Sequence, residues 1–157
     1  MYFTSLYSHC NNYSLPITTS VLDSSLPYHL FSSHFNVEVY KERTLVCKTN
    51  IHEVAEMGAI SISQKYAVVV TKSRMIKISI TANKDNKRGS LISAECTLNS
   101  INPSEIYLYN EHYVYLVCFD AIYVYDFSTL RMTAVINQDC NCYHIVPSPS
   151  LSKFFLI

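Results

Sequence analysis

Three side chains that could bind a metal lie close together in the last part of the sequence. Cys140, Cys142 and His144 form the string CNCYH, at a spacing that could supply two or three ligands to one ion. A structural zinc site uses four cysteine or histidine ligands. Because no second Cys/His pair lies nearby, we expect no metal and no other cofactor.

Histidine is the side chain best suited to act as a general base near neutral pH. The histidines of this chain are scattered, and none stands beside a serine, cysteine or carboxylate in a recognisable nucleophile motif. Catalytic groups can also meet through folding, so a hydrolase stays open as the third and least favoured hypothesis. We expect a protein that is not an enzyme. The candidates among the six histidines are His29, His34, His52, His112 and His144.

A short run of positive charge lies in the polar string ANKDNKRGS, which carries Lys84, Lys87 and Arg88. Such a basic loop could touch an anionic surface or an acidic partner, with each residue contributing on the order of 1 kcal/mol at a membrane. The alternative, which we favour, is a solvated turn in which Asp85 offsets one charge.

Composition excludes several classes of partner. The chain has 157 residues, of which 12 are Lys or Arg and 12 are Asp or Glu, so no net field would attract nucleic acid. Its two glycines form no phosphate-binding loop, and its thirteen tyrosines lack the interleaved basic residues of a base-stacking surface. No apolar run approaches a membrane span, and no secretion signal is present. We therefore expect a cytoplasmic protein with no nucleic-acid partner.

The same context bears on the cysteines. Six are present, and without a secretion signal we expect reduced thiols rather than disulfides. Cys47, Cys96 and Cys118 stand among apolar strand residues, where cysteine acts as a small core side chain.

The elements that must hold these residues are short strands. The string HYVYLVCFDAIYVYDFSTLRMTAVI, from His112 to Ile136, contains three runs of β-branched and aromatic residues. Both alternating faces of these runs are apolar, so both must be covered. Connections of a few residues permit antiparallel hairpins and exclude crossover helices. We expect these positions to be buried: Val68, Val70, Ile76, Ile78, Leu116, Val117, Ile122 and Val124.

The strands repeat in groups of four. RMIKISIT, starting at Arg74, and AIYVYDF, starting at Ala121, stand at equivalent places 47 residues apart, and this period is typical of propeller blades. We predict an all-β fold, a partial β-propeller of WD-repeat type, after a poorly ordered lead-in over residues 1–27. A turn at Ser32-Ser33 would separate the first two strands. The predicted blades span 28–50, 54–98 and 104–138, and a fourth starts over 144–157.

This order of strands resembles the PROPPIN family, the phosphoinositide-binding seven-bladed propellers of autophagy. SEIYLYNEHYVYLVCFDAIYVYDFSTLRMTAVI followed by HIVPSPSLSKFFLI looks like the family's third blade and the start of its fourth. In AIYVYDFSTLRMTAVI, a strand ending Ile-Tyr-Val-Tyr-Asp precedes a short turn, a leucine and an outgoing strand, as in the family. RMIKISI with LISAECTL looks like its second blade, and NVEVYKERTLVC like its first. The resemblance covers roughly Tyr28 to Ile157.

The resemblance implies a scaffold in autophagosome formation, with other autophagy proteins as partners. It also implies peripheral recruitment to phagophore, endosomal or vacuolar membranes by phosphatidylinositol 3-phosphate and 3,5-bisphosphate. The family binds these headgroups through a Phe/Leu-Arg-Arg-Gly motif in its fifth blade, which this sequence lacks. No lipid-binding residue is therefore carried over, and NKRGS, Asn86 to Ser90, does not replace the motif. The alternative is a WD-repeat scaffold that binds proteins without lipid.

About three blades cannot close a ring, because propellers typically need four to eight. We therefore expect either a truncated gene product or a protein whose ring is completed by its remaining blades or by another chain.

Overall fold

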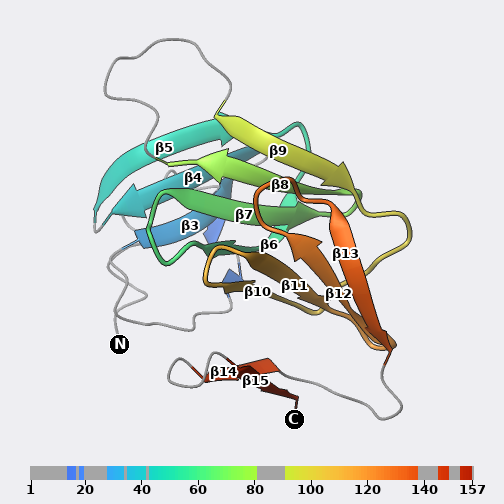
Figure 1. Ribbon diagram of the computed structural model, residues 1–157. Helices are drawn as coiled ribbons and strands as arrows, with labels where there is room; N and C mark the ends of the chain where they lie inside the picture. The colour runs from blue at the N-terminus through green and yellow to red at the C-terminus, as the bar shows by residue number, and fades with distance from the viewer. Residues whose placement is uncertain are drawn as a thin grey trace.

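The computed structural model describes residues 14–16, 18–19, 28–33, 35–41, 43–80, 91–137, 145–148 and 153–156 of the chain (Figure 1). These residues form β-strands and contain no helix. No helix long and apolar enough to cross a membrane occurs in this part of the chain. The strands are β1 (Ser14–Pro16), β2 (Thr18–Thr19), β3 (Tyr28–Ser33), β4 (Asn36–Lys41), β5 (Thr44–Asn50), β6 (Ala55–Ile60), β7 (Tyr66–Thr71), β8 (Arg74–Ser79), β9 (Ile92–Thr97), β10 (Glu105–Tyr109), β11 (Tyr113–Val117), β12 (Ala121–Asp126), β13 (Met132–Asn137), β14 (Ile145–Ser148) and β15 (Lys153–Leu156).

The strands pair as antiparallel meanders. The first sheet has the order β1-β3-β4-β5, the second β2-β6-β7-β8-β9 and the third β10-β11-β12-β13, while β14 and β15 form a hairpin. Only β2 is parallel to its neighbour β6 among these described strands. Figure 1 shows the second sheet, coloured green to yellow, between the first and the third. The predicted all-β, partial-propeller fold is confirmed.

A β-bulge at equivalent positions in the three sheets supports the predicted repeat of blades. In each sheet the pairing between the last two strands shifts by one residue, after Val39 in β4, after Lys77 in β8 and after Val124 in β12. The last two positions are 47 residues apart, as the sequence period predicts. A bulge increases the local twist of a strand pair. The three sheets therefore twist at equivalent places, as repeated blades should.

Both faces of the second sheet are buried. Leu30, Val37 and Val39 of the first sheet share a cluster with Val69 and Ile76 of the second. On the opposite face, residues of the second sheet pack against the third, in a cluster that includes Val68, Val70, Met75, Val114, Leu116 and Leu130. The eight positions predicted to be buried are all buried, which confirms the interpretation that these strands are covered on both faces.

Gly58 allows the first and second sheets to approach closely. A Cβ atom at this position would lie 3.1 Å from the Val68 carbonyl oxygen, 3.1 Å from Val69 Cγ1 and 3.2 Å from Leu30 Cδ1. These contacts are tighter than ordinary van der Waals contact. A larger residue in β6 would therefore require its neighbours to shift, and the preference for glycine comes from space, since its backbone conformation is one that other residues adopt.

Lys77 joins the second sheet to the third. Its side chain is 7% exposed, and its Nζ donates to the Phe127 carbonyl at 3.0 Å and to the Ser128 carbonyl at 3.1 Å. The ammonium also lies over the rings of Tyr66 and Phe127, at 4.9 and 4.7 Å from their centroids. Burial lowers the pKa of Lys77, and the negative charges of Asp126 and Glu111 partly offset that effect. The charge is thus held against the turn between β12 and β13.

The N-terminal part of the structure differs from the sequence-based predictions in two details. The predicted turn at Ser32-Ser33 is wrong, because both serines belong to β3 and pair with Val37 and Asn36. Short β1, within the predicted lead-in, adds an edge strand to the first sheet, and β2 does the same for the second. The other residues of 1–27 lie outside the described ranges. Neither short strand is a run of apolar β-branched and aromatic residues like those from which the longer strands were predicted.

The described cysteines are free thiols. Cys47 and Cys118 are buried and Cys96 is partly buried. Burial raises the pKa of each thiol, and for Cys118 it acts with the nearby Asp120 carboxylate to raise the pKa to about 11. These thiols therefore stay protonated near neutral pH and act as core residues, as the sequence analysis predicted.

Candidate binding pocket

Alternate connections of the meanders gather at one end of the sheets. In a series of antiparallel strands every second turn lies at the same end. This end, called here the pocket end, carries the turn around Phe35, the connections 51–54 and 98–104, and the turns 72–73 and 118–120. Two bonds tie these segments together. The Ile51 N–H donates to the Phe35 carbonyl at 2.7 Å, and the Leu98 N–H donates to the Ser73 carbonyl at 2.7 Å.

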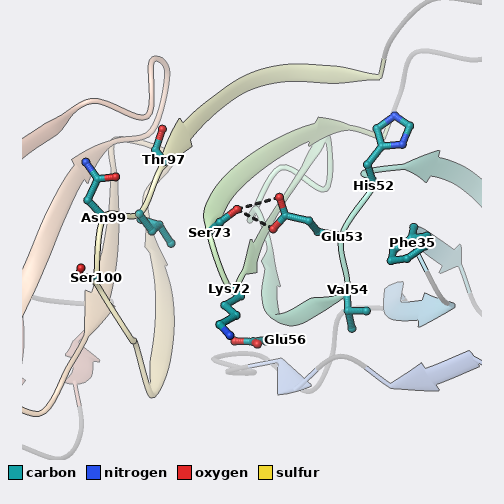
Figure 2. A pocket seen from close by; sticks show the side chains of 11 residues that line it. Phe35, His52, Glu53, Val54, Glu56, Lys72, Ser73, Thr97, Asn99 and Ser100 are labelled. Carbon is teal, nitrogen blue, oxygen red and sulfur yellow. Dashed lines mark hydrogen bonds between the residues drawn. The ribbon is translucent and has the colours of Figure 1, made fainter.

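An open pocket of about 740 Å³ lies among these segments (Figure 2). Its residues come from one turn of the first sheet, one turn of the second, the two connections between sheets, and the adjoining ends of β6 and β9. The wall combines apolar, polar and charged side chains, a mixture typical of a binding site. The lining residues are Phe35, His52, Glu53, Val54, Glu56, Lys72, Ser73, Thr97, Leu98, Asn99 and Ser100.

Glu53 is the most firmly held polar group of the pocket. Its carboxylate accepts hydrogen bonds from Thr71 Oγ1 at 2.6 Å, from Ser73 Oγ at 2.8 Å and from Arg74 Nε at 2.8 Å. Figure 2 shows Ser73 and Glu53 pointing toward each other across the pocket wall. The Thr71 hydroxyl, with Ser73 and Arg74, holds the pKa of Glu53 below its usual value. The carboxylate is therefore charged and fixed in place.

Arg74 links this carboxylate to two further elements. Its Nη2 donates to the Ile51 carbonyl at 2.6 Å, and its Nη1 lies 3.1 Å from a carboxylate oxygen of Glu95 on β9. One guanidinium thus holds the connection 51–54 against β8 and β9. The planar fork of arginine suits such simultaneous bonding.

The backbone of the pocket is also specialised. His52 and Ser100 both adopt the left-handed conformation, with φ of 60° and 59°. The His52 N–H donates to the Asn50 side-chain oxygen at 2.9 Å, which stabilises the turn. These two positions set the course of the two connections that line the pocket.

Exposed apolar side chains stand at the same end. Phe35 and Val54 line the pocket and are about half exposed, and Phe119, in the turn between β11 and β12, is 77% exposed. Single exposed apolar residues are common on protein surfaces. Three of them at the same end of the sheets, two lining a pocket, give the pocket end the character of a protein-binding surface.

The structure brings few of the candidate residues from the sequence together. His52 lines the pocket, whereas His29 lies in β3 and His112 lies in the turn between β10 and β11. Lys84, Lys87, Arg88, His34, Cys140, Cys142 and His144 lie outside the described residues. Within the described part of the chain, no cluster of three or more His, Cys, Asp or Glu residues could hold a metal ion.

The pocket itself was missed by the sequence analysis. Its residues come mainly from four connections that are distant in the sequence and share no motif, so no local pattern marks them. A signal was nevertheless present, because an unbroken series of antiparallel strands places alternate connections at one end. The network around Glu53 could not be predicted in the same way, since Glu53 reaches Thr71, Ser73 and Arg74 only when β6 pairs with β7.

Comparison with solved structures shows what this architecture is similar to. BamB from Moraxella catarrhalis is 12% identical, and the match covers 77% of this chain and 38% of that chain with a TM-score of 0.56. Hsv2 from Kluyveromyces lactis is 13% identical over 78% of this chain and 37% of that chain, with a TM-score of 0.54. Hsv2 from Kluyveromyces marxianus is 13% identical over 90% of this chain and 48% of that chain, with a TM-score of 0.57.

These proteins are β-propellers, and Hsv2 is a PROPPIN. The similarity to a PROPPIN that the sequence predicts is therefore confirmed in the fold, at low sequence identity. The chain spans less than half the length of each of these three structures. No protein family and no curated protein matches the sequence.

Proposed function

We propose that this chain is a non-catalytic scaffold that binds a segment of another protein in the pocket at the pocket end of the sheets. The observation that carries the proposal is the pocket itself, where Phe35 and Val54 stand exposed beside a fixed carboxylate. Apolar anchors next to a few oriented polar groups are typical of peptide-binding sites. Glu53 is already bonded to Arg74, so its carboxylate is engaged within the chain, and the exposed Phe35 and Val54 side chains suit a segment with an apolar anchor.

A non-catalytic role fits the bonding of the pocket. The Ser73 hydroxyl donates to Glu53, and within the described residues no bond joins it to the His52 imidazole. A serine activated for nucleophilic attack needs a base that accepts its proton and a group that orients that base. The carboxylate here instead serves to hold the turn 72–73.

The finer part of the proposal rests on the resemblance to PROPPINs. We propose a role in autophagosome formation, with cytoplasmic localisation and peripheral recruitment to phosphoinositide-bearing membranes. Headgroup binding would need a part that supplies the Arg-Arg-Gly motif, and ring closure would need further blades or another chain. A WD-repeat scaffold without lipid binding is the second candidate. In both candidate functions the pocket would bind a protein segment.

The pocket can be tested with a phage-displayed library of random peptides selected on the full chain. We expect enriched peptides to bind through the pocket and to lose about tenfold or more in affinity when Val54→Asp or Phe35→Ala is introduced. Ile62→Asp is the matched control, because Ile62 is an exposed apolar residue in the turn between β6 and β7, at the opposite end of the second sheet. Peptides whose affinity is unchanged by both pocket variants would contradict the proposal.

A further inference from the structure

The outer edge of the third sheet is protected by no charge and no proline, although it has the same kind of bulge as the outer edges of the other two sheets. Strand β13 pairs with β12 on one side, and no other described strand pairs with it. Five of its six residues are exposed. The outward backbone N–H and C=O groups of such a strand can pair with another strand, and proteins usually block this with charges, prolines or bulges.

The outer strands of the other two sheets carry such charges. Strand β5 contains Lys48, whose ammonium lies 2.7 Å from the Glu38 carboxylate. Strand β9 contains Glu95, which is more than half exposed and pairs with Arg74. Either strand would bring like charges together if it paired with its own copy. Strand β13, with the sequence MTAVIN, contains neither a charge nor a proline.

The bulge of the third sheet gathers the exposed apolar side chains of β13 on one face. Val135 pairs with Tyr123 and Met132 pairs with Tyr125, because the register shifts between Val124 and Tyr125. Residues opposite each other in an antiparallel pair point to the same face. Met132 and Val135, which are 55% and 43% exposed, therefore stand on one face, although three positions separate them in the sequence.

We propose that β13 pairs antiparallel with β13 of a second copy of this chain, about a twofold axis at Val135. The two third sheets then form one continuous sheet across the dimer. This places Val135 opposite its symmetry mate and Ala134 opposite Ile136 of the other copy. The exposed Val135 side chains of the two copies cover each other at the axis, and β13 brings no charged residue into the pairing.

A second copy suits this edge because a twofold axis makes an uncharged antiparallel strand complementary to itself. Arg131 directly precedes β13, so the two copies of this residue stand at opposite ends of the paired strands and do not repel each other. The proposal does not depend on the pocket, since no residue of β13 lines it.

The test is the mass of the full chain in solution, measured by light scattering coupled to size exclusion. We expect a dimer, at twice the 18.0 kDa chain mass. Val135→Lys should shift it to monomer, because two lysines would then face each other at the axis. Leu45→Lys is the matched control, since Leu45 is 45% exposed on β5. This variant should have the same mass in solution as the wild-type protein.

A second measurement covers the case in which Val135→Lys fails to fold, as judged by circular dichroism. A synthetic peptide of residues 131–137 should compete for the edge and dissociate the wild-type dimer, whereas a scrambled peptide should not. A wild-type protein that is monomeric at all accessible concentrations would overturn the proposal. A folded Val135→Lys protein with unchanged mass would overturn it too. If the wild-type chain forms larger species, Val135→Lys must dissociate them and Leu45→Lys must not.

Discussion

Lys77 shows how one buried charge can position a turn of the neighbouring sheet. Its ammonium satisfies two backbone carbonyls and lies against two aromatic rings. Lys77→Met would keep most of the packing of the side chain while leaving both carbonyls without this donor. We expect a loss of about 1–3 kcal/mol in the free energy of unfolding, measured by urea denaturation. Lys72→Met, in the exposed turn between β7 and β8, should change it little, and equal losses in both variants would contradict this role of Lys77.

Asp126 makes the same turn sensitive to acid. Hydrogen bonds from the side chains of Ser128 and Thr129, and from the Thr129 N–H, lower the pKa of Asp126 from 3.8 to about 2. A carboxyl group whose pKa is lower in the folded state stabilises the fold above its unfolded pKa and loses this effect as pH falls through the folded pKa. We therefore expect the wild-type Tm to fall as pH decreases from about 4 to 2.

Asp126→Asn isolates this contribution from those of other carboxylates. The variant should have a lower Tm than wild type at neutral pH and should lose less of it on acidification, so that the two curves converge near pH 2. Parallel curves at all pH values would show that Asp126 does not titrate as its bonding indicates.

For single residues, burial could be predicted from the sequence more fully than hydrogen bonding. Val68, Ile76 and Leu116 could be placed in the core because their apolar neighbours alternate onto both faces of short strands. The bonds of Lys77 could not be predicted, since it pairs with groups 50 and 51 residues away. A lysine inside an apolar strand signals such a partner but does not identify it.

At the scale of the elements, the position of β6 depends on the absence of a side chain at Gly58. Gly58→Ala would place a Cβ atom 3.1 Å from the Val68 carbonyl oxygen, a backbone atom of the adjacent strand that cannot move aside easily. We expect Gly58→Ala to cost about 1 kcal/mol and Gly58→Val about 1–3 kcal/mol, because overpacking strains a core. Chemical denaturation measures both, with Ile62→Ala at an exposed position as control. An alanine variant more stable than wild type would show that the sheets can separate without strain.

The strands were predicted well for a physical reason. From β4 to β13 their β-branched and aromatic residues are separated by polar connections, and short connections permit only antiparallel pairing. The error at Ser32-Ser33 came from reading serine as a turn residue, although Ser32 is buried in β3. β1 and β2 are too short to show any period, so their pairing with β3 and β6 depends on the tertiary structure.

For the whole molecule, the absence of the Arg-Arg-Gly motif leads to a prediction about membranes. We expect the chain alone to show no appreciable preference for liposomes containing phosphatidylinositol 3-phosphate over neutral liposomes, as measured by flotation. Three basic residues at about 1 kcal/mol each would give only weak attraction. Micromolar binding that disappears in the Lys87→Ala, Arg88→Ala double variant would show that the basic loop is a lipid site.

The near-complete pairing of consecutive strands has a consequence for synthesis on the ribosome. Each sheet is built mainly from one continuous stretch, so it can form soon after that stretch leaves the exit tunnel. Among the described residues, the second sheet is covered on its other face by residues 106–130, since Val68 and Met75 share a buried cluster with Leu116 and Leu130. At about 5–20 residues per second, this apolar face stays open to water for on the order of seconds. A nascent chain stalled shortly after β9 would therefore be the species that most needs a chaperone.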